Sequence, residues 1–275
     1  MSVLVAAVVV CYTLSSIAYL AFLFRQADGL NRLGFALLVA GFVLHSGLIL
    51  QGFIAAGHPP VSNLRETLIV AAWFLAGVFI LFQYRYNLKV MGVYTAPLLV
   101  FVMVVTVQLS TEPAYIPSDF NSFWLVLHIA AVFIGDAAFA LACGIGIFYL
   151  VQEQAIKRKH HGFFFKRLPS LQRIDAAAYA CLVIGFTLLT VGLVTGFVYA
   201  RLIWGAFWSW DPKEVWSCVT WLLYATLLHG RLSFGWRGKK AAVMSIVGFG
   251  VLLFTFLGVN FWLKGHHGEF TRLVS

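Results

Sequence analysis

Charged side chains are scarce in this chain of 275 residues: Asp, Glu, Lys and Arg make up 11% of it, against 61% hydrophobic residues. Soluble domains are about a quarter charged and about half apolar, so the composition excludes an ordinary soluble domain. Apolar stretches of roughly twenty residues recur along the whole chain, and each is long enough to cross a bilayer. The sequence therefore predicts an all-α polytopic membrane protein.

Paired cysteines and a cleavable leader are also missing. The four cysteines lie in apolar segments, and none belongs to a Cys-x-x-Cys pair, so a thiol–disulfide role has little support. The N-terminus has no basic lead and no small-residue cleavage site, which predicts a retained helix and not a signal peptide. No repeat period and no polar stretch of domain size is visible, so residues 1–275 are predicted to form one helical domain.

The apolar stretches predict eight transmembrane helices, at residues 3–24, 33–53, 67–83, 90–109, 124–151, 177–200, 217–232 and 240–263. Lys and Arg concentrate on the cytoplasmic side of membrane proteins. If the N-terminus faces outside, fourteen of the nineteen basic residues fall at inner ends of the spans and five at outer ends. The sequence therefore predicts both termini on the outer, periplasmic face. The net charge of +9 then indicates contact with anionic membrane lipid, and nucleic acid is not expected as a partner.

The longest inner loop, roughly residues 152–176, is basic and aromatic. This composition predicts a helix that lies on the anionic inner leaflet. A docking surface for a partner protein is the alternative interpretation.

A tryptophan-rich segment falls on the predicted outer face, between the sixth and seventh spans. Four tryptophans, two acids and one lysine lie within it: Trp204, Trp208, Trp210, Asp211, Lys213, Glu214 and Trp216. Their spacing permits an amphipathic helix lying in the interface. An aromatic belt at the lipid headgroups explains the tryptophans but not the charges among them. A flat aromatic shelf with a few charges suits a large planar ligand that carries carboxylates, and haem is such a ligand.

Histidines flank this segment on the same predicted face. His128 lies near the outer end of the fifth span, and His266 and His267 lie in the tail. Neutral imidazoles bind haem iron, and two on opposite faces give a six-coordinate centre. We therefore expect His128 and one of the two tail histidines to bind iron. His229 lies about 18 Å deeper, so it marks either an inner haem site with a ligand from elsewhere or an ordinary interfacial histidine.

Charged residues near the segment admit two interpretations. Arg201 and Lys213 suit pairing with haem propionates, judged from charge and location. Asp211 and Glu214 are alternatively structural, capping a helix or pairing with Lys213. Asp136 lies two turns below the predicted outer histidine, and a carboxylate there requires a partner, a proton or a water-filled cavity.

The stretch from Trp204 to Arg231, WGAFWSWDPKEVWSCVTWLLYATLLHGR, resembles the CcsA (ResC) family of system II cytochrome c biogenesis proteins. It keeps that family's WGxxWxWDPKExW, the following xTWLxY and the closing LHxR. The preceding RIDAAAYACLVIGFTLLTVGLVTG is similar to the family's sixth span, and GHPPVSNLRETL to its GHxPLSNxYESL. Together these segments extend the likeness over most of the chain from about residue 40.

This resemblance implies a haem-handling function. Haem b is cargo in this family: it passes from an inner site to an outer one, formed by the tryptophan-rich segment 201–218 and two histidines. There it is presented for thioether attachment to the CxxCH motif of apocytochrome c, which implies a haem lyase or synthetase component.

The resemblance also assigns the histidines. His128 matches the first outer histidine and His229 the intramembrane one. His267 matches the second outer histidine through Gly265-His-His-Gly268, although His266 stays an alternative because the family's Leu-His-Ser-Tyr is altered. Asp136 stands where relatives commonly have tyrosine.

A partner and a location are further implications. A CcsB (ResB)-like membrane protein is expected to supply the second inner ligand. The expected location is the bacterial inner membrane or a thylakoid-type equivalent.

Several rival interpretations remain. The nearest is a HemX-like membrane protein that acts in haem supply or regulation without ligating cytochrome c. The CcmC and CcmF proteins fit the DPKExW and LHxR segments less well. An electron-transfer cytochrome b would need histidine pairs on shared helices, and a transporter would need a charged relay or broken helices, neither of which stands out.

Overall fold

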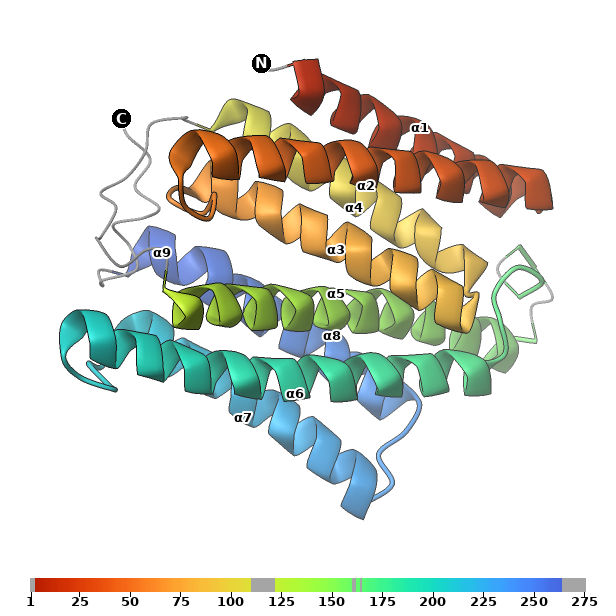
Figure 1. Cartoon of the computed structure of the whole chain (residues 1–275). Helices are drawn as coiled ribbons and strands as arrows, with labels where there is room; N and C mark the ends of the chain where they lie inside the picture. Colours follow the sequence, from red (N-terminus) through yellow and green to blue (C-terminus); the bar gives the residue numbers. More distant parts are fainter. Residues whose placement is uncertain (1–2, 110–121, 160–161, 164, 264–275) are drawn as a thin grey trace.

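The structure is a computed structural model that describes residues 3–109, 122–159, 162, 163 and 165–263. Its regular elements are all helical within these residues (Figure 1). They are α1 (Val3–Arg25), α2 (Asp28–Ala56), α3 (Leu64–Tyr86), the 3₁₀ turn η1 (Lys89–Met91), α4 (Gly92–Gln108), α5 (Phe123–Lys157), α6 (Leu171–Trp204), α7 (Pro212–Ser233), α8 (Lys239–Leu253), the π-helical turn η2 (Phe254–Gly258) and α9 (Val259–Trp262).

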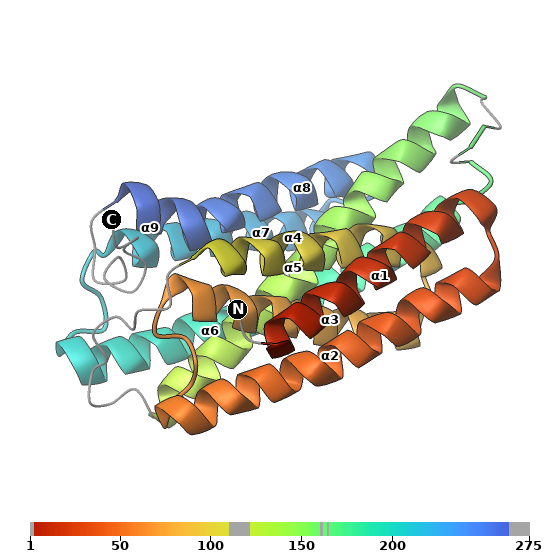
Figure 2. The same cartoon turned by 90° about the horizontal axis from the view of Figure 1, so that it is seen from above.

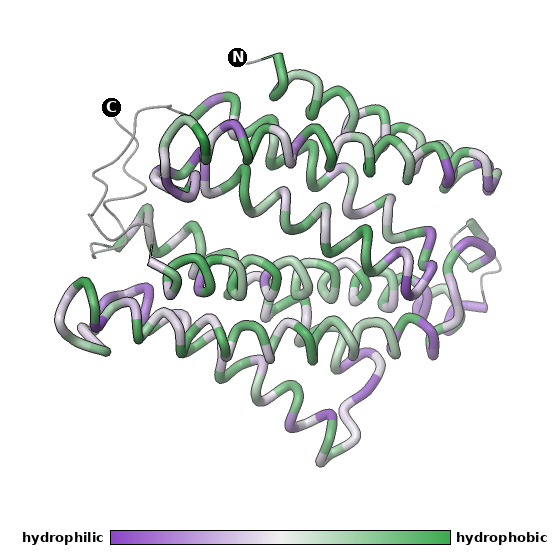
Figure 3. Tube along the Cα trace, viewed as in Figure 1, coloured by the Kyte–Doolittle hydropathy of each residue, from purple (hydrophilic) through white to green (hydrophobic). Residues whose placement is uncertain are grey.

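Seven of these helical segments are long and apolar enough to cross a membrane. The prediction of an all-α, multi-pass membrane protein is thus confirmed. The 22-residue α7 is not among the seven, because its sequence carries more polar residues than the others. Hydrophilic residues gather toward the helix ends, while the middles are largely apolar (Figure 3).

Successive long helices run in opposite directions, so their connections gather at the two ends of the bundle (Figure 1). Helices α1 to α4 form one half, and α5 to α9 form the other. Helix α5 lies in the middle and contacts α3, α6 and α8 (Figure 2). We call the end where α6 finishes and α7 starts the α6–α7 end.

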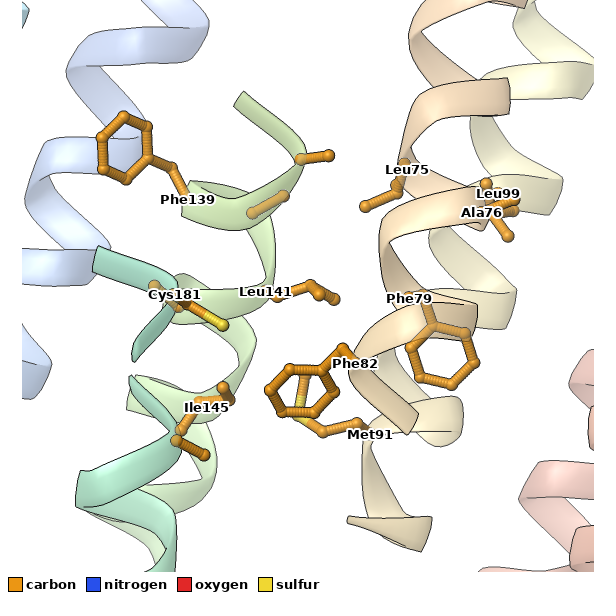
Figure 4. Close-up of a cluster of buried hydrophobic side chains, with 14 of the residues drawn as sticks. Leu75, Ala76, Phe79, Phe82, Met91, Leu99, Phe139, Leu141, Ile145 and Cys181 are labelled. Atoms are coloured by element: carbon orange, nitrogen blue, oxygen red, sulfur yellow. The ribbon is translucent and has the colours of Figure 1, made fainter. Parts of the chain in front are cut away.

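The two halves meet through a core of large apolar side chains between α3 and α5 (Figure 4). Phe79 and Phe82 contribute from α3, and Leu141 and Ile145 from α5; Phe79 and Leu141 are fully buried. Burying side chains of this size stabilises the packed state by about 1.5–3 kcal/mol each relative to water. The central position of α5 follows from this two-sided burial.

Helices α5 and α6 pack closely because glycines face the partner helix. A Cβ atom on Gly185 would lie 2.7 Å from the Phe139 ring, and one on Gly192 would lie 2.7 Å from a Val132 methyl. Small residues at such positions allow membrane helices to approach each other. This contact fixes where side chains of α5 lie relative to α6.

The prediction of a helix in the inner loop 152–176 is wrong over the described residues. Helix α5 continues only to Lys157, and the described residues from 158 to 170 form turns and bends before α6. Instead, the loop binds other helix ends: the Arg167 Nε donates to the Leu23 carbonyl at 2.7 Å, and the Arg173 guanidinium donates to the Tyr86 carbonyl at 2.9 Å. Both contacts satisfy carbonyls that a helix C-terminus leaves without a partner.

Candidate functional site

A cavity of about 270 Å³ lies at the α6–α7 end, between α3, α5, α6, α7 and the end of α8. Its walls are mainly apolar. The ionisable side chains among its lining residues are His128, Asp136, Lys213 and Glu214. This combination of an apolar enclosure with a few converging polar groups is typical of ligand sites.

His128 stands in the second turn of α5, and its ring lines the cavity. Its Nδ1 lies 2.7 Å from the carbonyl oxygen of Gly192 on α6. A carbonyl only accepts hydrogen bonds, so Nδ1 carries the proton and the neutral ring has its lone pair on Nε2. A backbone carbonyl that fixes the tautomer in this way is the usual support of a metal-binding histidine.

Gly196 makes room for this ring. A Cβ atom at position 196 would lie 2.9 Å from both Nδ1 and Cε1 of His128, closer than side-chain atoms normally approach. Gly192 and Gly196 are four residues apart on α6, in a Gly-x-x-x-Gly spacing that marks close helix contacts in membranes. That spacing was the available sequence signal for the two glycines, which the sequence analysis missed.

The single amphipathic helix that the spacing of Trp204 to Trp216 permits does not form. Helix α6 ends at Trp204 and is followed by Gly205 with φ of 74°, a left-handed conformation that glycine adopts without strain. Residues 205–211 are irregular, and α7 starts at Pro212, whose fixed φ suits the first helical position.

The two acids of the segment cap α7. The Asp211 carboxylate accepts from the Lys213 backbone N–H at 2.8 Å, and the Glu214 carboxylate accepts from the Asp211 N–H at 3.2 Å. Glu214 also accepts from the backbone N–H and the hydroxyl of Ser209, at 2.9 and 3.0 Å. Both acids are buried. This capping box confirms the structural interpretation of the pair.

The four tryptophans of the segment do not form one flat shelf, because the chain turns between them. Trp204 lines the cavity. Trp208 and Trp210 meet edge to face, with ring centroids 5.5 Å apart and an interplanar angle of 84°. Trp216 lies on α7 and contacts Phe254 of η2, at 4.6 Å and 64°. Trp210 is 77% exposed and has φ of 61°, which is unusual for a bulky residue.

Lys213 and Asp136 bring opposite charges to the cavity from α7 and α5. The sequence predicts that Asp136 requires a partner, a proton or a water-filled cavity, and in the structure the residue lines the cavity. The sequence analysis did not foresee its relation to Lys213, since this depends on how α5 packs against α7 and α8. Arg201 is exposed at the end of α6, with its guanidinium carbon 5.8 Å from the centroid of the Phe207 ring, and it does not line the cavity.

Helix α8 is followed directly by the π-helical turn η2, which lies beside the cavity. Thr255 and Phe256 of this turn are lining residues. The Thr255 hydroxyl lies 2.9 Å from the hydroxyl of Thr220, which also lines the cavity from α7. Single π-helical turns inside longer helices frequently occur at functional sites.

His229 is placed differently. It is exposed near the other end of α7, and its ring meets Phe234 edge to face at 5.7 Å. It is thus remote from the cavity, as the sequence predicts. His45, by contrast, is fully buried in the other half of the bundle, with Nδ1 3.2 Å from the Tyr12 hydroxyl. His266 and His267 lie outside the described residues.

Comparisons with known proteins agree on one family. The family model for the cytochrome c assembly protein matches residues 61–267. The cytochrome c biogenesis protein CcsA of Guillardia theta is 30% identical over 274 residues, covering 92% of this chain and 91% of that protein. CcsA of Synechococcus sp. (strain JA-3-3Ab) is 30% identical over 300 residues, covering 89% and 87%.

A solved structure shares the fold. The chain superposes on cytochrome c haem lyase CcmF with a TM-score of 0.62 and 18% sequence identity, over 97% of this chain and 47% of that one. The chain therefore spans about half the length of CcmF. At this identity the likeness concerns the helical arrangement alone. From the family match and the relatives that align along nearly the whole chain, it follows that this chain belongs to the cytochrome c assembly proteins, in the CcsA family of system II cytochrome c biogenesis.

Proposed function

We propose that this chain carries haem b to the α6–α7 end and presents it there for covalent attachment to the CxxCH motif of apocytochrome c. Membership of a cytochrome c biogenesis family supports the pathway. The observation that supports the site is His128: its ring lines the cavity and is fixed by Gly192 in the tautomer that binds iron through Nε2.

The cavity suits one part of a porphyrin. About 270 Å³ is close to the lower limit of small-molecule sites, roughly 300–1,000 Å³, so the cavity receives an edge of the macrocycle and the rest extends beyond it. Apolar side chains and Trp204 form its wall. In the proposal, Trp208, Trp210 and Trp216 contact the part of the porphyrin that extends beyond the cavity. Each aromatic contact contributes about 0.5–1.5 kcal/mol beyond the burial of its area.

The second axial ligand in this proposal is His267, with His266 as the alternative. A bis-histidine iron has no open position, which limits side reactions with oxygen until the apoprotein's own histidine replaces one ligand. In this proposal Lys213 binds a propionate inside the cavity, which it lines, and Arg201 binds one from outside it.

Thioether formation needs positioning more than acid–base chemistry. The sulfur of an apocytochrome cysteine bonds to a vinyl carbon, and the thiol hydrogen is added to the neighbouring carbon, so no electrons are gained or lost overall. Holding thiol and vinyl together contributes through proximity and orientation. We therefore assign the chain to a haem lyase, or synthetase, acting in a complex.

His229 is the proposed ligand of an inner haem. It is exposed on α7, which is the least apolar of the long helices, and polar side chains at membrane depth normally face protein. A CcsB (ResB)-like partner would supply the opposite ligand and cover this face.

The orientation in the membrane is part of the same proposal. With α7 counted as a span, α1 starts and α9 finishes at the α6–α7 end, and we assign that end to the outer face. Fourteen basic residues then lie at the inner end, where the exposed ones among them would meet anionic lipid. The membrane would be the bacterial cytoplasmic membrane or a thylakoid-type equivalent, and residues 1–275 would act as one helical domain with 201–218 as its haem-presenting segment.

The visible spectrum of the detergent-purified protein tests the proposal. Wild type should show a six-coordinate b-type spectrum, which the double variant His128→Ala, His267→Ala should lose. His266→Ala is the matched control and should keep it. If the protein contains no haem even when co-produced with a CcsB-like partner, the synthetase function is wrong and a HemX-like role in haem supply is favoured.

A further inference from the structure

Asp136 is a charged group in the cavity for which the proposed function has no use. It lies on α5 as a half-buried residue and lines the cavity. It forms no hydrogen bond or ion pair with any other residue in the described part of the chain. A carboxylate in such an apolar enclosure is costly unless an opposite charge or a ligand is near.

The opposite charge is Lys213. The Asp136 carboxylate and the Lys213 ammonium interact electrostatically. They are not in direct contact, because the ion pairs within 4.0 Å among the described residues join other side chains. The two charges therefore attract each other across part of the cavity without forming an ion pair.

The pair lies deeper in the bundle than the iron-binding position. Asp136 follows His128 by eight residues, or about 12 Å along α5. The Lys213 Nζ is 6.0 Å from the centroid of the Phe256 ring, which in turn meets the ring of Phe133 at 5.9 Å. Phe133 lies between the other two positions on α5, so the ammonium extends inward from the start of α7.

The other carboxylates near Lys213 already accept hydrogen bonds from the start of α7 and the residues before it. The carboxylate of Asp211 caps α7, and that of Glu214 accepts three hydrogen bonds from Ser209 and Asp211. Asp211 also attracts Lys213 electrostatically. Lys213 is the one cation among the described lining residues, and Asp136 is the lining carboxylate that no N–H or O–H group holds.

We propose that Asp136 is the counter-charge of Lys213 when the cavity holds no haem, and that a haem propionate takes its place at Lys213 on loading. The inference rests on the proposed function, because it requires haem in this cavity. Asp136 then stays as a second negative charge near the propionate and weakens haem retention. A carrier must release its cargo, so this repulsion favours transfer to the apoprotein.

The same arrangement orients the porphyrin. Propionates and vinyl groups occupy opposite sides of the haem b ring. With a propionate held inward at Lys213, the vinyl groups point toward the α6–α7 end. The thiols of an arriving apocytochrome would meet them there.

The test compares haem with haem dimethyl ester, which keeps the iron and the vinyls but has no propionate charge. The rate of transfer from the purified full chain to excess apomyoglobin is measured for wild type, Asp136→Asn and Lys213→Gln. We expect Asp136→Asn to slow haem loss by about tenfold and to leave ester loss unchanged. Lys213→Gln should accelerate haem loss and likewise spare the ester. Asp136→Ser serves as a second neutral variant should the asparagine variant not fold.

Two results would overturn the inference: haem loss unchanged in the neutral variants of Asp136, or equal changes for haem and ester. The variant His128→Ala separates this failure from that of the proposed function. It should lose haem and ester alike, because iron ligation does not depend on the propionates. If it retains haem fully, the cavity is not the haem site and the proposed function itself fails.

Discussion

His128 and His229 lie near opposite ends of the bundle, one lining a cavity beside α6 and the other exposed on α7. The His128 ring is fixed by the Gly192 carbonyl and accommodated by Gly196. The described surroundings of His229 offer one aromatic contact, from Phe234. The comparison teaches that, under the proposed function, this chain would build most of the outer site, whereas the inner site would need a second protein to enclose it.

The largest effect should come from displacing the His128 ring. Gly196→Ala places a methyl 2.9 Å from the imidazole, so the ring must move and its hydrogen bond to Gly192 is lost. We expect haem affinity to fall by about tenfold or more, equivalent to about 1.4 kcal/mol, measured by haem titration. Gly250→Ala is the control, because a methyl there meets nothing within 4 Å. Equal affinity in the two variants would show that the ring orientation is unimportant.

The next effect separates the inner site from the outer one. His229→Ala removes an exposed side chain, so the free energy of unfolding of the isolated chain should change by less than about 0.5 kcal/mol. Haem that is added directly to the purified variant should bind at the outer site as it does in wild type. In cells with the partner, however, haem-stained cytochrome c should decrease. Loss of directly supplied haem would contradict the separation of the two sites.

Two glutamates in the first turns of α3 and α7, both at the α6–α7 end, provide a matched pair of smaller perturbations. Glu66 accepts from the Ser62 backbone N–H at 2.8 Å before α3, as Glu214 does from Ser209 at 2.9 Å before α7. Glu66→Gln and Glu214→Gln should each lower the free energy of unfolding by about 1 kcal/mol, measured by denaturant titration.

The Glu214→Gln variant alone should also weaken haem binding, because Glu214 lines the cavity and fixes the start of α7. If Glu66→Gln weakens it equally, the effect belongs to general stability and not to the site.

The smallest effect concerns Trp210, whose left-handed backbone costs a bulky residue about 1–2 kcal/mol. Since the side chain is 77% exposed, Trp210→Gly should leave stability unchanged or raise it by up to about 1 kcal/mol. Trp208→Gly should lower stability, since Trp208 packs edge to face against Phe197 at 5.9 Å. Thermal unfolding of both ligand-free variants checks the contrast. A destabilised Trp210→Gly would mean that the exposed ring contributes packing after all.

Much of the fold could be predicted, because membrane spans are encoded locally as apolar runs long enough for a bilayer. The break after Trp204 was also encoded locally, by Gly205 and by the Asp211-Pro212 start of α7 with an acid three residues after the cap. The helical spacing of the tryptophans permits a continuous helix but does not require one. Periodicity alone does not exclude a turn.

The site itself was only partly predictable. His128 is a candidate from its place near the end of a span, but its tautomer depends on Gly192, which is 64 residues away. The relation of Asp136 to Lys213 depends likewise on the packing of three helices. Single residues at helix ends are readable from sequence, whereas distances between residues of different helices arise only when the bundle packs.

The hydrogen bonds from Arg167 to the end of α1 have a consequence for the order in which the chain is made and folded. Its guanidinium donates to the Leu23 and Phe24 carbonyls across 144 and 143 residues of chain. At about 5–20 residues per second, a ribosome needs on the order of ten seconds to make that interval. During this time the Leu23 carbonyl has a local donor in the Gln26 side-chain amide, at 3.1 Å, whereas the Phe24 carbonyl relies on water or lipid headgroups at the membrane surface. The first helix therefore enters the bilayer early, but its end is bound by Arg167 only later, when the loop between α5 and α6 has been made.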